Sequence, residues 1–130
     1  MKNRGQVSEW LGRAREDRNS ALFLLEKMHP IPCEVVCYLC QQAAEKILKS
    51  LLFASEQPLL KSHDLTRIAE QLATVLPVDD EILRACAVLT PYSTSSRYPS
   101  MLEIDDIRTA HTVSQMNVIF CWAEAVLDGL

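Results

Sequence analysis

The amino-acid sequence predicts an all-α fold, an up-and-down bundle of about five helices. Glycine occurs only three times in the chain, and no alternating run of β-branched residues, as in a strand, is present. The six prolines fall between stretches whose apolar residues recur at helical spacing. Because proline interrupts a helix, these positions mark where one helix ends and the next begins.

The prolines divide the chain into five expected helices. They cover residues 8–28, 33–54, 63–75, 79–90 and 105–128. The chain has no internal repeat, low-complexity tract or linker, and 130 residues are an ordinary length for one domain. We therefore expect residues 1–130 to form a single helical domain.

Composition and charge argue against several classes of protein. Hydrophobic residues make up 48% and charged residues 23% of the chain, as in folded globular proteins. The net charge of −4 and the pI near 5.3 argue against strong general binding of nucleic acid. No apolar run approaches the roughly 20 residues of a membrane-spanning helix, so no membrane association is expected. The N-terminus shows no signal segment, and we interpret the five cysteines as reduced thiols in the cytoplasm.

The first expected helix carries an acidic residue on its apolar side. Ser8 is predicted to cap its N-terminus. At about 100° per residue, one stripe collects Trp10, Ala14, Asp17, Ala21, Leu24, Leu25 and Met28. Because an ionised carboxylate on an apolar stripe is costly unless it meets a cation, we expect Asp17 to pair with Arg97 or Lys49.

The second and the last expected helices each have two partly apolar faces. In the second, a face of cysteines and aliphatic residues lies opposite Val35, Tyr38, Gln42, Glu45, Lys49 and Phe53. In the last, one face holds Ile107, Ala110, Val118, Cys121, Trp122 and Ala125, and the other holds Val113, Met116, Phe120 and Leu127. One small core cannot cover both faces of two helices, so we expect a homodimer.

Cys33, Cys37 and Cys40 have the spacing with which radical-SAM enzymes hold an iron–sulfur cluster. That motif requires a loop and a large α/β barrel, whereas these residues fall inside an apolar helix of a short chain. We interpret them as core residues, because a buried free cysteine behaves as a small hydrophobe. No bound metal and no cofactor are expected.

No catalytic triad and no glycine-rich phosphate loop can be assembled from the sequence. His29 falls at the end of the first expected helix, and His111 lies on an apolar stripe, where a core or interface histidine is expected. Ser62 or Asp64 is predicted to cap the third helix. The chain on its own is not expected to be an enzyme.

Polar residues from several segments are predicted to meet. One interpretation is a structural network that sets the helix register, formed by Asp17, Gln42 and Glu45. The other is a nucleotide-binding site whose cations hold a phosphate. Its expected members are Lys46, Lys49, His63, Arg97 and Tyr98. Both interpretations stay open at this point.

Four short motifs along the chain resemble those of the HEPN family, in the same order. They are Trp10, Ala14 and Asp17; the segment from Cys40 to Lys49; His63, Asp64 and Leu65; and Ser96, Arg97, Tyr98 and Pro99. The resemblance implies a helical bundle like the C-terminal domain of kanamycin nucleotidyltransferase. It also implies binding of a nucleotide (ATP or similar), homodimers, and pairing with a separate minimal nucleotidyltransferase.

A second branch of that superfamily consists of metal-independent ribonucleases, often toxins, which carry an arginine followed after four to six residues by a histidine. This chain departs from the pattern, because no histidine follows Arg97 at that distance and only two residues separate Arg108 from His111. Three hypotheses follow: a nucleotide-binding or adaptor module that acts with a nucleotidyltransferase, an RNA-cleaving toxin, and a dimerisation or antitoxin-like protein without a small ligand. The resemblance favours the first.

Overall fold

The computed structural model describes residues 3–93 and 104–130, which form five α-helices and one short 3-10 helix. The elements are α1 (Arg4–Lys27), α2 (Cys33–Ala54), α3 (Leu65–Leu72), α4 (Asp80–Leu89), η1 (Thr90–Tyr92) and α5 (Asp106–Asp128). No β-strand occurs in these two stretches, and the predicted all-α class is confirmed.

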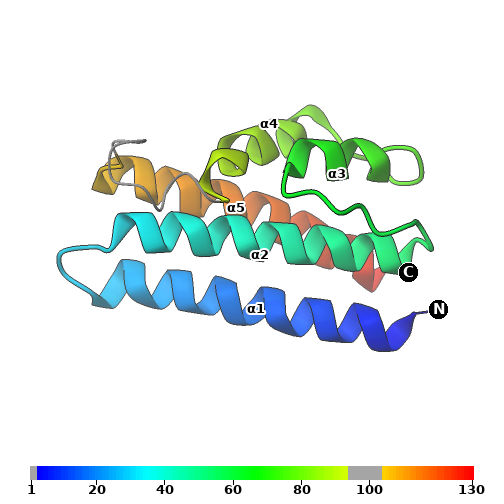
Figure 1. The fold of residues 1–130 in the computed structure, drawn as a ribbon, viewed down its shortest axis with the longest axis horizontal. Coiled ribbons are helices and arrows are strands. Elements are labelled where there is room, and N and C mark those ends of the chain that lie inside the picture. The colour runs from blue at the N-terminus through cyan, green and yellow to red at the C-terminus, as the bar shows by residue number, and fades with distance from the viewer. Residues whose placement is uncertain (1–2, 94–103) are drawn as a thin grey trace.

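Helix α2 lies in the middle of the bundle. It forms an antiparallel hairpin with α1, while α5 packs along it and α3 and α4 lie on the side away from α1 (Figure 1). Helices α1, α2, α4 and α5 alternate in direction, as in an up-and-down bundle, and the short α3 precedes the return made by α4 (Figure 1).

The central position of α2 explains its two partly apolar faces. From Val36 onward its cysteine-containing face is fully buried, with Cys37, Cys40, Ile47 and Leu48 at 0% exposure. Burial of each such aliphatic side chain stabilises the fold by about 1.5–3 kcal/mol. Helix α1 brings small residues, Ala14 and Ala21, to the contact.

Three helices begin with an aspartate side-chain cap, of which the one at Asp64 was predicted. The carboxylates of Asp64, Asp79 and Asp105 accept hydrogen bonds from backbone amides in the first turn of α3, α4 and α5. The predicted cap at Ser8 is wrong, because α1 begins at Arg4. Asn3 precedes it with a left-handed φ of 61°, a conformation that asparagine tolerates, and its side chain donates to the carbonyl of Phe53 at 3.1 Å.

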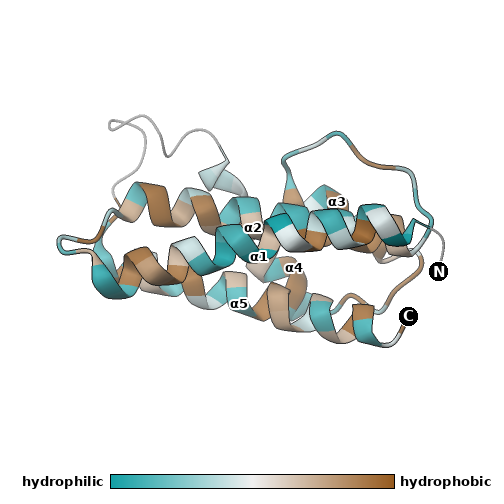
Figure 2. Cartoon of the chain, turned by 90° about the horizontal axis from the view of Figure 1, so that it is seen from below, coloured by the Kyte–Doolittle hydropathy of each residue, from teal (hydrophilic) through white to brown (hydrophobic). Residues whose placement is uncertain are grey.

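His111, which was expected to be a core or interface residue, does not lie in the core. The core face of α5 is the one with Val113, Met116 and Phe120, whereas His111 is exposed. Ile107, on the same outer side of α5, is 82% exposed. Figure 2 shows that hydrophobic and hydrophilic residues alternate in short stretches along the helices. The described helices include none with the length and apolar character needed to cross a membrane.

Candidate functional site

An ion pair joins α1 to α2 at the acidic residue of the apolar stripe. Lys46 Nζ lies 2.5 Å from Asp17 Oδ2, and the two side chains are only 24% and 20% exposed. The expectation that Asp17 meets a cation is confirmed. The expected partners differ, because Lys49 is engaged by Glu45 within α2 and Arg97 lies outside the described residues.

A buried carboxylate, that of Glu45, organises the second part of the cluster. Glu45 is 5% exposed and accepts hydrogen bonds from Lys49 Nζ at 2.9 Å and from Gln41 Nε2 at 3.0 Å. His63 Nδ1 lies 2.9 Å from the same carboxylate. Gln41, Glu45 and Lys49 follow one another at four-residue spacing, which places them on one face of α2.

The hydrogen bonds keep Glu45 ionised. Burial by itself would raise the pKa of the Glu45 carboxyl, but the donors Lys49, Gln41 and His63 and the positive charge of Lys49 lower that pKa below its ordinary value. A buried carboxylate with three donors is a satisfied group, so this arrangement fixes the relative positions of α2 and the segment before α3.

Gln41 is a member of the cluster that the sequence interpretation left out. It is fully buried, donates to the carbonyl of His63 at 3.3 Å and accepts a hydrogen bond from Gln42 at 2.6 Å. Gln42, which was expected in the network, lies at its edge. The four-residue spacing from Gln41 to Glu45 is the signal that indicates the central role of Gln41.

The two lysines that were expected to hold a phosphate both have partners inside the fold. Lys46 pairs with Asp17, and Lys49 pairs with Glu45. Lys49 also lies 5.8 Å from the centroid of the Trp10 ring and is 7% exposed. Of the expected phosphate-binding residues in the described ranges, His63 is therefore the exposed one, with a side chain 68% exposed. Arg97 and Tyr98 lie outside the described residues.

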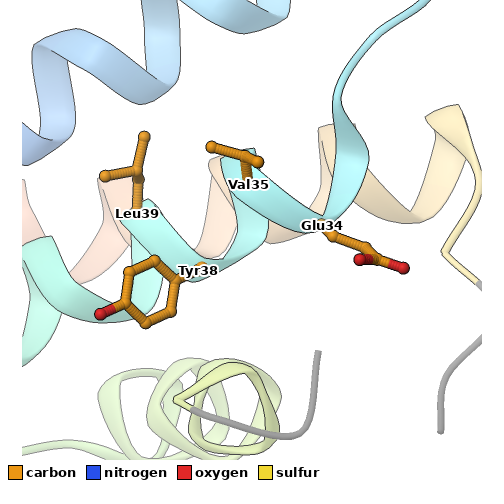
Figure 3. A pocket seen from close by; sticks show the side chains of 4 residues that line it. All are labelled: Glu34, Val35, Tyr38 and Leu39. Carbon is orange, nitrogen blue, oxygen red and sulfur yellow. The ribbon is translucent and has the colours of Figure 1, made fainter. Parts of the chain in front are cut away.

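A shallow groove lies on the exposed face of α2, near the α1–α2 loop. Glu34, Val35, Tyr38 and Leu39 line it, with a volume of about 360 Å³. Val35 and Leu39 point toward the α1 side, whereas Tyr38 points the opposite way (Figure 3). Val35 is 50% exposed, so the groove has an apolar wall that water reaches.

The cysteines behave as packing residues in α2. Cys37 and Cys40 are fully buried, and burial raises the pKa of both thiols, which disfavours the thiolate that a metal requires. Cys33 was also expected in the core, but it is only half-buried at the start of α2, and its thiol donates to Asp106 at 3.4 Å. Within residues 3–93 and 104–130, no group of three or more His, Cys, Asp or Glu side chains is arranged to hold a metal ion.

Comparison with known proteins identifies a family and a fold. The HEPN domain model matches residues 7–126. The crystal structure of TT1696 from Thermus thermophilus has a TM-score of 0.81 at 23% identity, over 92% of this chain and 97% of that chain. The crystal structure of ST0689, an archaeal HEPN homologue, has a TM-score of 0.73 at 21% identity, over 92% and 95%. No curated protein matches the chain.

Proposed function

Because the chain belongs to the HEPN domain family, we propose that it is a binding or adaptor module that acts with a separate minimal nucleotidyltransferase. The charged groups of the central cluster pair inside the fold, so the proposed docking does not depend on them. Asp17, Glu45, Lys46 and Lys49 are paired with one another, and such internally satisfied pairs stabilise a scaffold.

The observation that carries the proposal is an apolar surface at the end of the α1–α2 hairpin. We define this hairpin-end surface by Phe23, Met28 and Val35, which are 63%, 50% and 50% exposed. The groove beside Val35 extends it along α2. Exposed apolar side chains gathered near a groove are typical of a docking surface for another protein.

The test is co-expression of this chain with a minimal nucleotidyltransferase from the same genome. We expect a complex that survives gel filtration, and we expect Val35→Asp to weaken it at least tenfold, since a charge would be buried in an apolar contact. Leu59→Asp is the matched control, because Leu59 is also an exposed apolar residue, at 40%, but lies outside this surface. Absence of any complex, or equal loss from both variants, contradicts the proposal.

A second candidate function, nucleotide binding, rests on the exposed ring of His63. Calorimetry with ATP and other nucleotides, with and without the partner protein, tests it. The binding hypothesis predicts that His63→Asn weakens affinity, while Lys46→Met mainly lowers stability because it leaves Asp17 unpaired. If wild-type protein binds no nucleotide in either state, this candidate is wrong and the adaptor role stands alone.

A further inference from the structure

The three histidines of this chain permit a comparison within one molecule. His29, His63 and His111 are all exposed. The ring of His63 is bonded to Glu45, whereas no hydrogen bond or ion pair joins the rings of His29 and His111 to another described residue. His63 is thus an exposed histidine with a partner inside the bundle.

His63 is held at two points although its side chain is 68% exposed. Its ring Nδ1 lies 2.9 Å from Glu45 Oε1, and its backbone carbonyl accepts a hydrogen bond from Gln41 Nε2 at 3.3 Å. Glu45 and Gln41 are themselves buried and bonded to each other at 3.0 Å. The position of the ring is therefore set by α2 rather than by the segment that carries it.

The carboxylate decides which nitrogen of the ring is available. An ionised carboxylate only accepts hydrogen bonds, so the proton of a neutral His63 resides on Nδ1. The lone pair is then on Nε2, for which the described residues offer no partner. Among the described residues, neither of the other two histidines has such a partner to fix its tautomer.

We propose that His63 Nε2 is a nucleophile that accepts a phosphoryl group. The Nε2 lone pair attacks the phosphorus of a phosphoramidate or acyl phosphate donor, which can be a small molecule or a phosphorylated side chain of a partner protein. The new Nε2–P bond forms while the donor's P–N or P–O bond breaks, and the leaving group takes the electron pair and, where it is an amine, a proton from water. Glu45 stabilises the positive charge that the ring acquires, because Nδ1–H continues to donate to it.

The surroundings of Glu45 favour this chemistry over the alternatives. A lone carboxylate next to the ring would repel a phosphoryl group, but Lys49 offsets the charge of Glu45 at 2.9 Å. A metal ion would need further ligands, and the described part of the chain offers no group of three for one. The inference is independent of the nucleotidyltransferase partner proposed above.

The experiment treats the full-length chain with potassium phosphoramidate at neutral pH and locates the acid-labile label by peptide mass spectrometry. We expect His63 to be labelled about tenfold faster than His29 and His111, the rate equivalent of one charge-assisted hydrogen bond. Phosphorus NMR should show an Nε2-linked phosphohistidine. Equal labelling of the three histidines, or Nδ1 linkage at His63, would overturn the proposal.

Two variants test whether the labelling of His63 depends on Glu45 or only on the exposure of the His63 ring. Glu45→Gln keeps the shape of the side chain but removes its charge, so labelling of His63 should fall to the rate of the other two histidines. His111→Gln is the control and should leave the labelling of His63 unchanged. If Glu45→Gln does not fold, the labelling rates of the three histidines in the unsubstituted chain still test the proposal. Labelling of His63 that is unaffected in folded Glu45→Gln protein refutes the role of the carboxylate.

Discussion

At the scale of single residues, Glu45 and Asp17 both lie in surroundings that would be costly for an isolated charge. Glu45 is 5% exposed and has three donors, whereas Asp17 has one cation, and its side chain is 20% exposed. The more deeply buried carboxylate thus has the more complete set of partners. We therefore expect substitution of Glu45 and substitution of Asp17 to change the stability of the fold in different ways.

Lowering the pH should remove the contribution of the Glu45 carboxylate to the stability of the fold. Its pKa is lowered in the folded chain, although burial opposes the shift, and the unfolded chain has a Glu pKa of about 4.3. The stabilisation is therefore fully present above about pH 4.3 and is lost as the pH falls through the folded pKa. Urea unfolding should be measured at several pH values from 7 to 3. The free energy of unfolding should fall more steeply with decreasing pH for wild type than for Glu45→Gln. Glu26 is exposed, so Glu26→Gln is the control and should show the same pH dependence as wild type. If the free energy of unfolding depends on pH equally in wild type and Glu45→Gln, the prediction is wrong.

Asp17→Ala should lower the free energy of unfolding by about 1–3 kcal/mol, because it leaves Lys46 without its partner. The roughly 3–5 kcal/mol of a fully buried pair is not expected, since water reaches part of both side chains. Denaturant unfolding measures the change. Glu9→Ala is the matched control: Glu9 pairs with Arg13 on the surface, with side chains 67% and 64% exposed, and should change little. An equal effect of the two variants would show that the Asp17 pair adds nothing beyond a surface pair.

At the scale of elements, α5 combines a core face with an outer face of polar and small residues that also carries the apolar Ile107. Met116 and Phe120 are buried, while Cys121 is exposed. Near its start, Arg108 Nε donates to the Tyr92 hydroxyl at 2.8 Å, which links α5 to η1. This contact gives Arg108 a structural role between the two elements.

We expect no intrinsic ribonuclease activity. Arg108 bonds Tyr92, and His111 follows it without the longer spacing of the ribonuclease branch, so no acid–base and phosphate-stabilising couple is evident at this place. A quenched fluorescent RNA substrate should stay intact at micromolar protein. Cleavage that disappears in His111→Ala but persists in His29→Ala would show that the interpretation of α5 is wrong.

At the scale of the whole molecule, apolar side chains remain exposed at both the hairpin end and the outer side of α5. Phe23 is 63% and Ile107 82% exposed. These positions lie on different helices, α1 and α5. The start of α5 nevertheless lies beside the α1–α2 hairpin end, because Asp106 and Val35 line one groove.

We expect a homodimer that uses the outer side of α5. A stable interface buries roughly 1,200–2,000 Å² in total, a modest part of two such chains, since each exposes 7099 Å². Light scattering at micromolar concentration should give twice the chain mass, and Ile107→Asp should shift it to the monomer. Leu59→Asp is the control and should remain dimeric. A monomeric wild-type mass would refute the prediction.

Local spacing alone was sufficient to predict the helices, the burial of Cys37 and Cys40 in α2 and the need of Asp17 for a cation. Each of these depends only on the spacing of residues along one helix. The spacing of the apolar residues and the positions of the prolines can be read directly from the sequence. The resemblance of four short motifs also predicted the family that the comparison of the whole chain then identified.

Only the tertiary structure decided which partners meet across helices. It paired Asp17 with Lys46, brought Gln41 and His63 to Glu45, and turned His111 outward. These outcomes depend on the rotation and register of one helix against another, which close packing of the core sets and which no local pattern contains. A helix with two partly apolar faces, such as α5, presents both equally in its sequence, and the neighbouring helices select the one that is buried.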